Sequence, residues 1–368
     1  MRAVVAIPAR NEEAHLSTCL AALARQTDLR GEPLQIYGVL LLLNNCGDSS
    51  MAVARAFSDE FGGRLRIVNR RLPPSQSHAG GARRLAMDLA AEWLLREGAA
   101  DGLLLTTDAD SRVGTTWIAQ NLAAMTKGVD AVAGDIVLDP NDESRLPEAL
   151  RRRGLLESTY ERQLIEIAAY LDPLAHNPWP HHATVSGASL ALSVSAYRRI
   201  DGLPALPLGE DKALMKALQR QDFRIRFAPE IKVVTSGRLV GRAEGGVATT
   251  MRHRVENPMA ACDAFLEPLE IAFKRSFWRG QTRAIHRSRR ETGRGEAFYF
   301  GEVWESVEPI TIPQNTPLSP SALPKNIDRA HHALDRLRAQ LGAPGDVEAK
   351  ALKLFAPNVL KDALRGLQ

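Results

Sequence analysis

The amino-acid sequence predicts an α/β protein whose central, mostly parallel sheet is flanked by helices. In the first half of the chain, short apolar runs alternate with segments whose apolar residues recur at helical spacing. All but the last of these runs precede a helical segment, which is the order expected of parallel strands joined by helices. Polar residues stand directly after several runs, at the edge where open parallel sheets gather their ligand-binding loops.

The first half can be assigned element by element. The apolar runs predict strands at 3–7, 36–43, 65–68, 103–107 and 131–138. Helical spacing predicts helices at 50–61, 82–96 and 117–125. A first helix is expected after Asn11, which suits the N-cap position and places Glu12 and Glu13 in the first turn.

The second half is less regular. We expect a helical run at 155–171, a strand of small residues at 185–192, a short helix at 196–200, a helix from Gly209 onward, and strand-like runs at 223–227 and 232–235. Small residues in a strand are typical of a place where another group approaches the backbone closely. Further helices are expected at 258–277, 327–341 and 347–364, the last kinked or broken near Pro357.

These patterns predict two domains. The first covers residues 1–255, with halves at 1–138 and 139–255. Residues 256–368 form a mainly helical C-terminal extension, with a Pro-rich linker around 308–325. The sequence leaves open whether the C-terminal helices pack on the first domain, form a homo-oligomer or rest on a membrane surface.

Composition favours a globular protein that handles anionic small molecules. Its 368 residues include 47 Lys and Arg against 43 Asp and Glu, a small excess unlike the charge of a nucleic-acid-binding protein. The three cysteines form no CxxC pair, which fits a reducing compartment. We recognise no signal peptide and no transmembrane segment. A cytoplasmic protein is expected, and peripheral contact with the inner membrane face is left open.

Two aspartates follow the apolar run at 103–107. Asp108 and Asp110 are one residue apart, so an extended backbone would point both carboxylates to the same side. Such oxygen donors suit Mg²⁺ or Mn²⁺, which often keep substrate phosphates among their ligands. The alternative is a solvated turn after a strand.

Two other stretches are candidates for binding a phosphate group. Gly80 and Gly81 open a helix, where free backbone N–H groups favour anions, and Arg83 can add a forked contact to a diphosphate. The glycines and arginines of 236–246 predict a lid over the ligand, with Arg238 and Arg242 screening a diphosphate. A simple turn and a surface connection are the respective alternatives.

The chain resembles glycosyltransferase family 2 in a series of motifs. They occur in the family's order: Val4-Val5-Ala6-Ile7-Pro8-Ala9-Arg10-Asn11-Glu12-Glu13, Asn44-Asn45-Cys46-Gly47-Asp48-Ser49-Ser50, Gly80-Gly81-Ala82-Arg83, Thr107-Asp108-Ala109-Asp110 and Gly209-Glu210-Asp211. This resemblance covers about residues 1–235 and implies a GT-A-like fold and a nucleotide-diphosphate-sugar donor. On this basis 1–138 is the nucleotide-sugar-binding half and 139–255 the acceptor and catalytic half.

The resemblance also implies roles for individual residues. Pro8, Ala9 and Glu12 would line the nucleotide pocket, Asp48 would approach the base, and Asp108 would lie near the ribose. Asp110, the second aspartate of the DXD motif, would hold the metal on the diphosphate. The other residues of these motifs assigned to the donor site are Arg10, Asn45, Gly81, Arg83 and Ala109. Departures from the family pattern at Asn44, Asn45 and Arg84 leave the base and the sugar open.

Sugar transfer to a hydroxyl needs a group that accepts the hydroxyl proton, and a carboxylate can do so. Glu210 and Asp211 begin a helix, and consecutive helical residues point about 100° apart, so one of them is expected to be the base. Similarity to inverting family members favours Asp211, with Glu210 supporting the site. Capping of the helix by these acids is the alternative.

The acceptor side is predicted from the loop 176–182. Trp179 can stack on a sugar ring, and His181 and His182 stand beside it. Several enzymes of the family resembled supply a histidine to the metal, which makes His253 a candidate ligand. A packed surface loop and a structural histidine are the alternatives.

We therefore predict a soluble, metal-dependent glycosyltransferase that moves one sugar from a nucleotide-diphosphate donor to an acceptor hydroxyl, with inversion. One alternative is a sugar nucleotidyltransferase, but those enzymes carry a glycine-rich basic loop after the first strand, where this chain has Pro8 to Asn11. The other is a non-catalytic nucleotide-sugar-binding protein. The acceptor is unknown.

Overall fold

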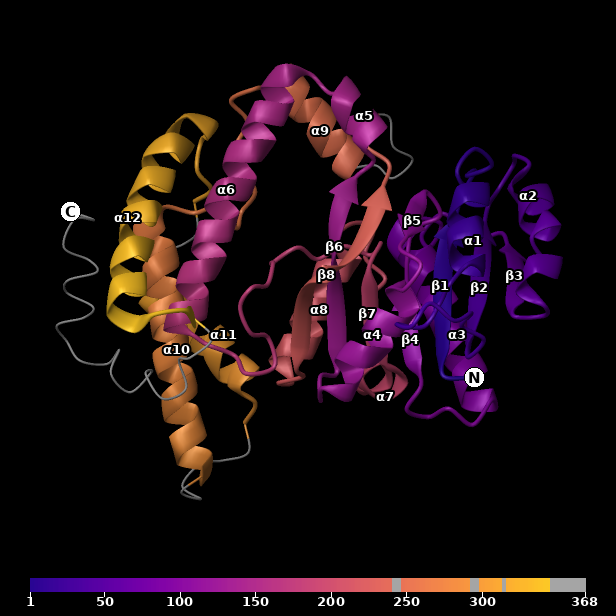
Figure 1. Cartoon of the computed structure of the whole chain (residues 1–368), viewed down its shortest axis with the longest axis horizontal. Helices are drawn as coiled ribbons and strands as arrows, with labels where there is room; N and C mark the ends of the chain where they lie inside the picture. The colour runs from indigo at the N-terminus through magenta and orange to yellow at the C-terminus, as the bar shows by residue number, and fades with distance from the viewer. Residues whose placement is uncertain (240–245, 292–297, 313–315, 345–368) are drawn as a thin grey trace. The chain divides into compact units, whose positions relative to one another are not determined.

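The computed structural model describes residues 1–239, 246–291, 298–312 and 316–344. By its internal contacts the chain forms two compact units (Figure 1). Unit 1 consists of residues 1–145, 183–219 and 223–249, and unit 2 of residues 146–182, 220–222 and 250 onward. Residues 146–182, which sequence analysis placed in the acceptor half, thus pack with the C-terminal helices. In the described part of the chain, the helices lack the length and apolar character needed to span a bilayer.

Unit 1 is built on an eight-stranded sheet in the order β3-β2-β1-β4-β7-β6-β8-β5. The strands are β1 (Ala3–Ala9), β2 (Tyr37–Asn44), β3 (Leu65–Arg70), β4 (Leu103–Thr106), β5 (Ser111–Val113), β6 (Ala131–Leu138), β7 (Leu190–Ser193) and β8 (Ile225–Thr235). The first four in this order are mutually parallel. β7 runs antiparallel to both β4 and β6, β8 is parallel to β6, and β5 is antiparallel to β8. The predicted α/β class is confirmed.

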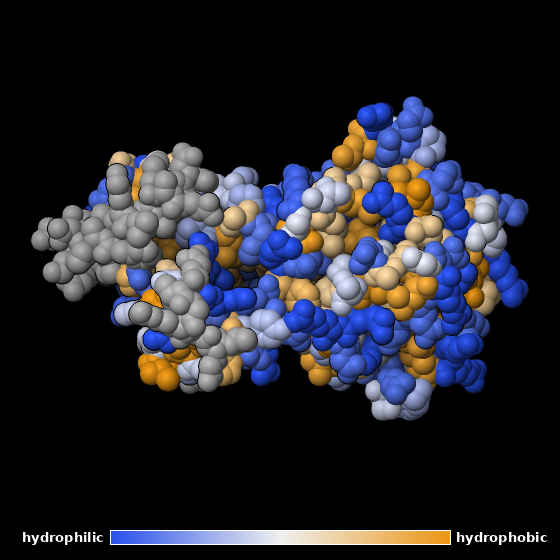
Figure 2. Space-filling view, turned by 90° about the horizontal axis from the view of Figure 1, so that it is seen from below, coloured by the Kyte–Doolittle hydropathy of each residue, from blue (hydrophilic) through white to orange (hydrophobic). Residues whose placement is uncertain are grey.

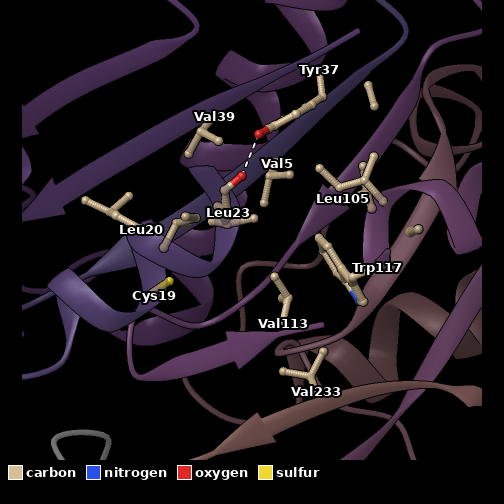
Figure 3. Close-up of a cluster of buried hydrophobic side chains, with 14 of the residues drawn as sticks. Val5, Cys19, Leu20, Leu23, Tyr37, Val39, Leu105, Val113, Trp117 and Val233 are labelled. Carbon is tan, nitrogen blue, oxygen red and sulfur yellow. Dashed lines mark hydrogen bonds between the residues drawn. The ribbon is translucent and has the colours of Figure 1, made fainter. Parts of the chain in front are cut away.

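Helices cover both faces of this sheet. They are α1 (Leu16–Ala24), α2 (Ser50–Ala56), α3 (Ala79–Arg96), α4 (Trp117–Thr126), α5 (Pro140–Arg145), α7 (Val194–Arg199) and α8 (Glu210–Arg220), with a short 3₁₀ turn at Asp59–Phe61. Alternate residues of β1 serve different cores, since Val5 packs with α1 and α4, and Val4 packs with α3. Figure 3 shows the first of these cores, where the Tyr37 hydroxyl donates a hydrogen bond to the Leu23 carbonyl.

The structure corrects the start of the first helix. Helix α1 begins at Leu16 rather than after Asn11, and Asn11 is in the left-handed region with φ of 55°. Its side-chain oxygen accepts a hydrogen bond from the Gly47 N–H, at 2.8 Å, instead of capping a helix. Contacts between loops therefore override the local capping preference of asparagine.

Other boundaries also differ from the sequence expectation. The helix expected at 50–61 ends at Ala56, and the two strand-like runs at 223–235 form one strand, β8, beside an irregularity in β6 between Gly134 and Asp135. Strand β7 is shorter than expected and begins only at Leu190. Strand β5 and helix α5 were not predicted, because each is too short to show a clear pattern.

Unit 2 is helical. It contains α6 (Glu148–Leu171), most of α9 (Val247–Glu256), α10 (Leu269–Glu291), α11 (Phe300–Thr311), a 3₁₀ turn at Pro320–Ala322 and α12 (Leu323–Leu341). Its core joins Tyr160 of α6, Phe273 of α10 and Leu334 of α12. The helix expected at 258–277 instead begins at Leu269 and continues through the basic stretch, and α11 enters the segment read as a Pro-rich linker. The helix expected at 347–364 lies outside the described residues.

Helices α6 and α10 approach each other closely. A Cβ atom on Gly280 of α10 would collide with the carbonyl oxygen of Leu171. Just after α6, the buried Asp172 carboxylate accepts hydrogen bonds from Arg279 at 2.6 Å and from Arg283 at 2.7 and 3.1 Å. Burial alone would raise the pKa of Asp172, but the two guanidinium groups outweigh it and hold that pKa below its ordinary value.

Hydrophilic residues cover much of the face drawn in Figure 2. They are interspersed there with smaller hydrophobic areas. Isolated exposed apolar residues are normal on folded proteins.

We predict that Asp172→Asn destabilises unit 2 by about 3–5 kcal/mol, because two guanidinium groups would be left without their carboxylate. Urea unfolding followed by circular dichroism measures the change. Because the folded pKa of Asp172 is lowered, its contribution is present above the unfolded value of about 3.9 and is lost as the pH falls through the folded value. The variant should therefore lose less stability than the parent protein on acidification below about pH 4.

The control is Asp335→Asn in the same unit, since Asp335 is exposed and its contacts with Arg338, at 3.5 Å, and with His331, at 3.4 Å, are both long. This variant should change stability by less than about 0.5 kcal/mol. Equal effects of the two substitutions would contradict the importance assigned to the buried cluster.

Candidate active site

The carboxyl ends of β1, β2 and β4 form one rim of the sheet in unit 1. The loops that follow β1 and β2 are joined by hydrogen bonds in both directions. Backbone N–H groups of Asn11, Glu12 and Glu13 donate to side chains of the second loop, and those of Gly47 and Ser49 donate to side chains of the first. The loop after β4 lies beside α1, where the Cys19 thiol donates to the Asp108 carbonyl at 3.5 Å. The predicted meeting of distant loops is thus seen in the structure.

Asp48 is part of this connection. Its carboxylate accepts hydrogen bonds from the backbone N–H groups of Glu13 and Ser50, both at 3.0 Å. Burial tends to raise the pKa of Asp48, but hydrogen bonds from Ser50 and Glu13 lower it below its ordinary value. Asp48 thus stays ionised while it fixes the shape of the rim.

Arg83 of α3 is buried beneath the rim and donates hydrogen bonds to several groups there. Its guanidinium donates to Asp108 at 2.7 Å, Glu210 at 3.1 Å and Thr106 at 3.0 Å. It also donates to the carbonyl oxygen of Gly187 at 2.9 Å. Burial lowers the pKa of Arg83, but Asp108 and Glu210 outweigh that effect and raise it, so the residue remains charged. Arg83 is only 5% exposed, and its hydrogen bonds are directed to protein groups.

Gly187 lets the guanidinium reach this position. A Cβ atom there would collide with the guanidinium of Arg83. The close approach expected from the small residues at 185–192 is therefore made by a side chain from α3. The N–H of Gly187 donates to the Asp211 carboxylate at 3.1 Å. The backbone of Gly187 therefore contacts Asp211 through its N–H and Arg83 through its carbonyl oxygen.

Glu210 and Asp211 differ in environment although they are neighbours in the first turn of α8. Glu210 is buried and bound to Arg83, whereas Asp211 is half-buried and is oriented by hydrogen bonds from the backbone N–H groups of Gly187 and Lys212. The divergence follows from the helical turn, which points the two side chains in different directions.

Arg238, which follows β8, is the second guanidinium of the rim. It pairs with Asp110 at 2.8 Å and with Glu12 at 3.1 and 3.3 Å. Ser236 and Gly237, which precede it, are held by the Asp142 carboxylate of α5. Arg242, predicted to act with Arg238, lies outside the described residues.

Negative charge is in excess around Asp110. Burial and the nearby charge of Asp108 raise the pKa of Asp110 to about 6; Glu12 adds to the rise and Arg238 opposes it. Within the described part of unit 1, the rim brings Glu12, Asp108, Asp110, Glu210 and Asp211 together with two guanidinium groups. No cluster of three metal-binding side chains is preformed among the described residues. The oxygen donors and the charge imbalance nevertheless fit a hard divalent cation bound at Asp110.

The start of α3 is capped by the protein itself. The ring of His78 accepts a hydrogen bond from the Gly81 N–H at 3.1 Å, so this N–H already has a partner. The capping role of His78 was not predicted, and histidine is an uncommon capping residue.

Other candidates of the donor site lie along the same rim. Pro8 is half-buried, and Ala9 and Ala109 are buried. Arg10 is exposed and donates to the Ser77 carbonyl. The Asn45 side chain exchanges two hydrogen bonds with the backbone of Leu72, which fixes the second loop.

The remaining candidates belong to unit 2. Trp179 and His181 form an edge-to-face pair with ring centroids 6.0 Å apart, and His182 follows in the same loop. His253 is exposed on α9, and its ring nitrogen is 3.3 Å from the side-chain amide of Asn257. The structure thus gathers the donor and base candidates of unit 1, whereas these four residues belong to the other unit.

Comparisons with known proteins give a family and a set of similar structures. Residues 2–254 match the family described as Glycosyltransferase like family 2. No curated protein sequence gives a significant match. The structure of S. aureus TarS aligns over 77% of this chain and 44% of its own, with 12% identity and a TM-score of 0.44.

Two further solved structures are similar. TarS 1-349 of S. aureus in complex with UDP has 14% identity, covers 92% of each chain and gives a TM-score of 0.45. The mannosyltransferase PcManGT of Pyrobaculum calidifontis in complex with GDP-Man and Mn²⁺ has 16% identity, with 98% of this chain and 83% of that chain covered and a TM-score of 0.46. The observed sheet and helices conform to the predicted GT-A-like class. Because the family match spans well over half of the sequence, this chain belongs to the glycosyltransferase-like family 2 and is a glycosyltransferase.

Proposed function

We propose that the rim of unit 1 transfers a sugar from a nucleoside-diphosphate donor to an acceptor hydroxyl, with inversion and with help from a divalent cation. The observation that carries this proposal is the convergence of acids and guanidinium groups at the carboxyl edge of parallel strands. A diphosphate needs positive charge, and an attacking hydroxyl needs a base. The rim offers groups for both tasks.

The donor nucleotide would lie on the connected loops after β1 and β2. Pro8, Ala9 and Glu12 would line its pocket, and Asp48 would face the base from a loop that its own hydrogen bonds hold in place. Preformed loops reduce the entropy lost on binding. Arg10, Asn45, Gly81 and Ala109 complete this set.

Arg83 would act as a positioning residue rather than as a direct ligand of the diphosphate. Its hydrogen bonds fix Asp108 on one side and Glu210 on the other. Asp108 would then meet the ribose in a fixed orientation. This role differs from the forked contact suggested by the sequence, because the guanidinium is buried.

Asp110 would hold Mg²⁺ or Mn²⁺. When bound, the ion would neutralise the diphosphate and stabilise it as a leaving group. Arg238 now compensates the charge of Asp110. We propose that Arg238 leaves Asp110 when the cation binds and turns to the phosphate oxygens, which its planar guanidinium suits.

Asp211 would be the catalytic base. Its carboxylate is oriented by the Gly187 N–H and is less buried than that of Glu210, which is already engaged by Arg83. As the acceptor oxygen bonds to the anomeric carbon, its proton passes to Asp211 and the bond from that carbon to the phosphate oxygen breaks. Direct attack on the face opposite the leaving group inverts the configuration.

Substitution of Asp110 and Asp211 should separate donor binding from transfer. A thermal-shift panel of nucleoside diphosphates with Mn²⁺ first identifies the preferred base, since a bound ligand stabilises the folded protein. Asp110→Ala should lose the Mn²⁺-dependent part of that shift. Asp211→Asn should keep the shift but transfer sugar about 10²–10⁴-fold more slowly. Retained transfer in both variants would exclude the mechanism.

Removing Arg238 should strengthen the binding of Mn²⁺ alone. Arg238→Met deletes the group that competes for Asp110, so we expect roughly tenfold tighter Mn²⁺ binding by electron paramagnetic resonance, equivalent to about 1.4 kcal/mol. Arg112→Met is the matched control, because Arg112 pairs with Asp139 rather than with rim acids. Unchanged Mn²⁺ affinity in Arg238→Met would show that the two cations do not compete.

The packing of Gly187 against Arg83 can be tested with one methyl group. Gly187→Ala should displace the guanidinium, lower stability by about 1–3 kcal/mol and weaken binding of the preferred nucleotide. Gly114→Ala is the control, because a Cβ atom at Gly114 would meet open space. Calorimetric titration and thermal unfolding report the two effects. Nucleotide binding that is equal in both variants would contradict the positioning role of Arg83.

A further inference from the structure

Unit 2 contains a cavity where its helices α6 and α12 end. The two helices pack side by side in the core of this unit (Figure 1). Among the described residues, the cavity has a volume of about 370 Å³ and is lined by Glu166, Tyr170, Trp179, Arg338 and residues 342–344. This volume is in the range of small-molecule binding sites. The rim of unit 1 contributes no residue to the lining.

The polar groups of the cavity are held in place by one another. Glu166 is only 8% exposed, and its carboxylate accepts two hydrogen bonds from the Arg338 guanidinium, at 2.9 and 2.8 Å. The Tyr170 hydroxyl donates to the carbonyl oxygen of Gly342 at 2.7 Å. Burial raises the pKa of Tyr170, and the charge of Glu166 adds to the rise, so the hydroxyl stays protonated.

These contacts leave hydrogen-bonding capacity for a ligand. A carboxylate has about four acceptor positions and a guanidinium has five N–H groups, and the Glu166–Arg338 pair uses two of each. The remaining nitrogen of Arg338, Nη1, has only a long contact with Asp335, at 3.5 Å. The lining therefore presents an acceptor and a donor side by side.

Trp179 supplies an aromatic ring to the same cavity. It lies in the loop after α6, is half-buried and meets His181 edge-to-face. Among the described residues, its indole N–H has no hydrogen-bond partner. An aromatic side chain with an apolar body and an unused polar group suits a ligand that is itself part apolar and part polar.

The chemistry of the lining selects among ligand classes. The charges of Glu166 and Arg338 cancel, so the cavity does not favour a phosphate or another anion. A wholly apolar ligand would take the carboxylate and the guanidinium out of water without new hydrogen bonds, which is unfavourable. A sugar ring meets both conditions, because it has an apolar C–H face and neighbouring hydroxyl groups that each donate and accept.

We propose that this cavity binds one sugar residue of a neutral glycan. The C–H face of the sugar packs on the Trp179 ring, and neighbouring hydroxyls bind Glu166 and Arg338. This inference goes beyond the proposed sugar transfer, because it concerns unit 2 and is measured without a donor. The sequence pointed to Trp179 alone, since Glu166 and Arg338 are 172 residues apart and meet only in the folded chain.

The test is calorimetric titration of the full-length protein with maltotetraose, cellotetraose, chitotetraose and β-1,4-mannotetraose. We expect at least one of them to bind, with the same affinity at low and high salt because the ligand carries no charge. Trp179→Leu should weaken that binding at least about tenfold, equivalent to about 1.4 kcal/mol. Trp179→Phe keeps an aromatic face and should stay within about threefold of the parent protein.

A second variant addresses the polar partners. Arg338→Lys keeps a positive charge beside Glu166 but lacks the planar fork, so binding should weaken about fivefold. Trp278→Leu is the matched control, because Trp278 is an exposed tryptophan of the same unit that does not line the cavity. It should leave glycan binding unchanged.

The outcomes separate this proposal from the proposed function. The nucleotide-dependent thermal shift should be the same in Trp179→Leu and in the parent protein, because the donor candidates belong to unit 1. Thermal unfolding identifies a variant that fails to fold, and Arg338→Lys and Trp179→Phe then decide. Failure of all four tetrasaccharides to bind, or unchanged binding in folded Trp179→Leu or Arg338→Lys, would overturn the glycan site and leave the sugar transfer untouched.

Discussion

The site depends on the compensation of crowded carboxylates by two guanidinium groups. Arg83 holds Asp108 and Glu210 from beneath the rim, and Arg238 holds Asp110 and Glu12 from a segment after β8. The two arginines differ in burial, since Arg83 is sealed in the protein and Arg238 lies nearer the surface. Arg83 is therefore part of the packed interior, whereas Arg238 follows the last residue of β8 and is held through Ser236 and Gly237 by Asp142.

This division explains why Asp108 and Asp110, though only two residues apart, are suited to different tasks. Asp108 has a fixed partner and a defined orientation. Burial and the nearby charges of Asp108 and Glu12 raise the pKa of Asp110 to about 6, and Arg238 compensates them only in part. A cation bound there would relieve that imbalance, and a diphosphate would follow the cation.

The sequence predicts the strands of the parallel half well, because their apolar runs are long and each precedes a helix. It also singles out Asp108 and Asp110, because they stand directly after a strand, and Glu210 and Asp211, because they begin a helix. It does not predict the role of Arg83, whose four acceptors come from residues 106, 108, 187 and 210 and meet only in the folded chain. The N-cap role predicted for Asn11 was wrong for the same reason, because its hydrogen-bond partner, Gly47, is on another loop. The assignments of Trp179, His181, His182 and His253 rest on residue type and on the family resemblance, and these side chains belong to unit 2.

The reciprocal hydrogen bonds between the loops after β1 and β2 have a consequence for the evolution of the enzyme. Glu13 and Asp48 each accept a backbone N–H of the other loop, so a substitution in one loop disturbs the conformation of both. If the nucleotide base lies on these loops as proposed, a change of base preference would involve coordinated substitutions in two distant stretches of the gene.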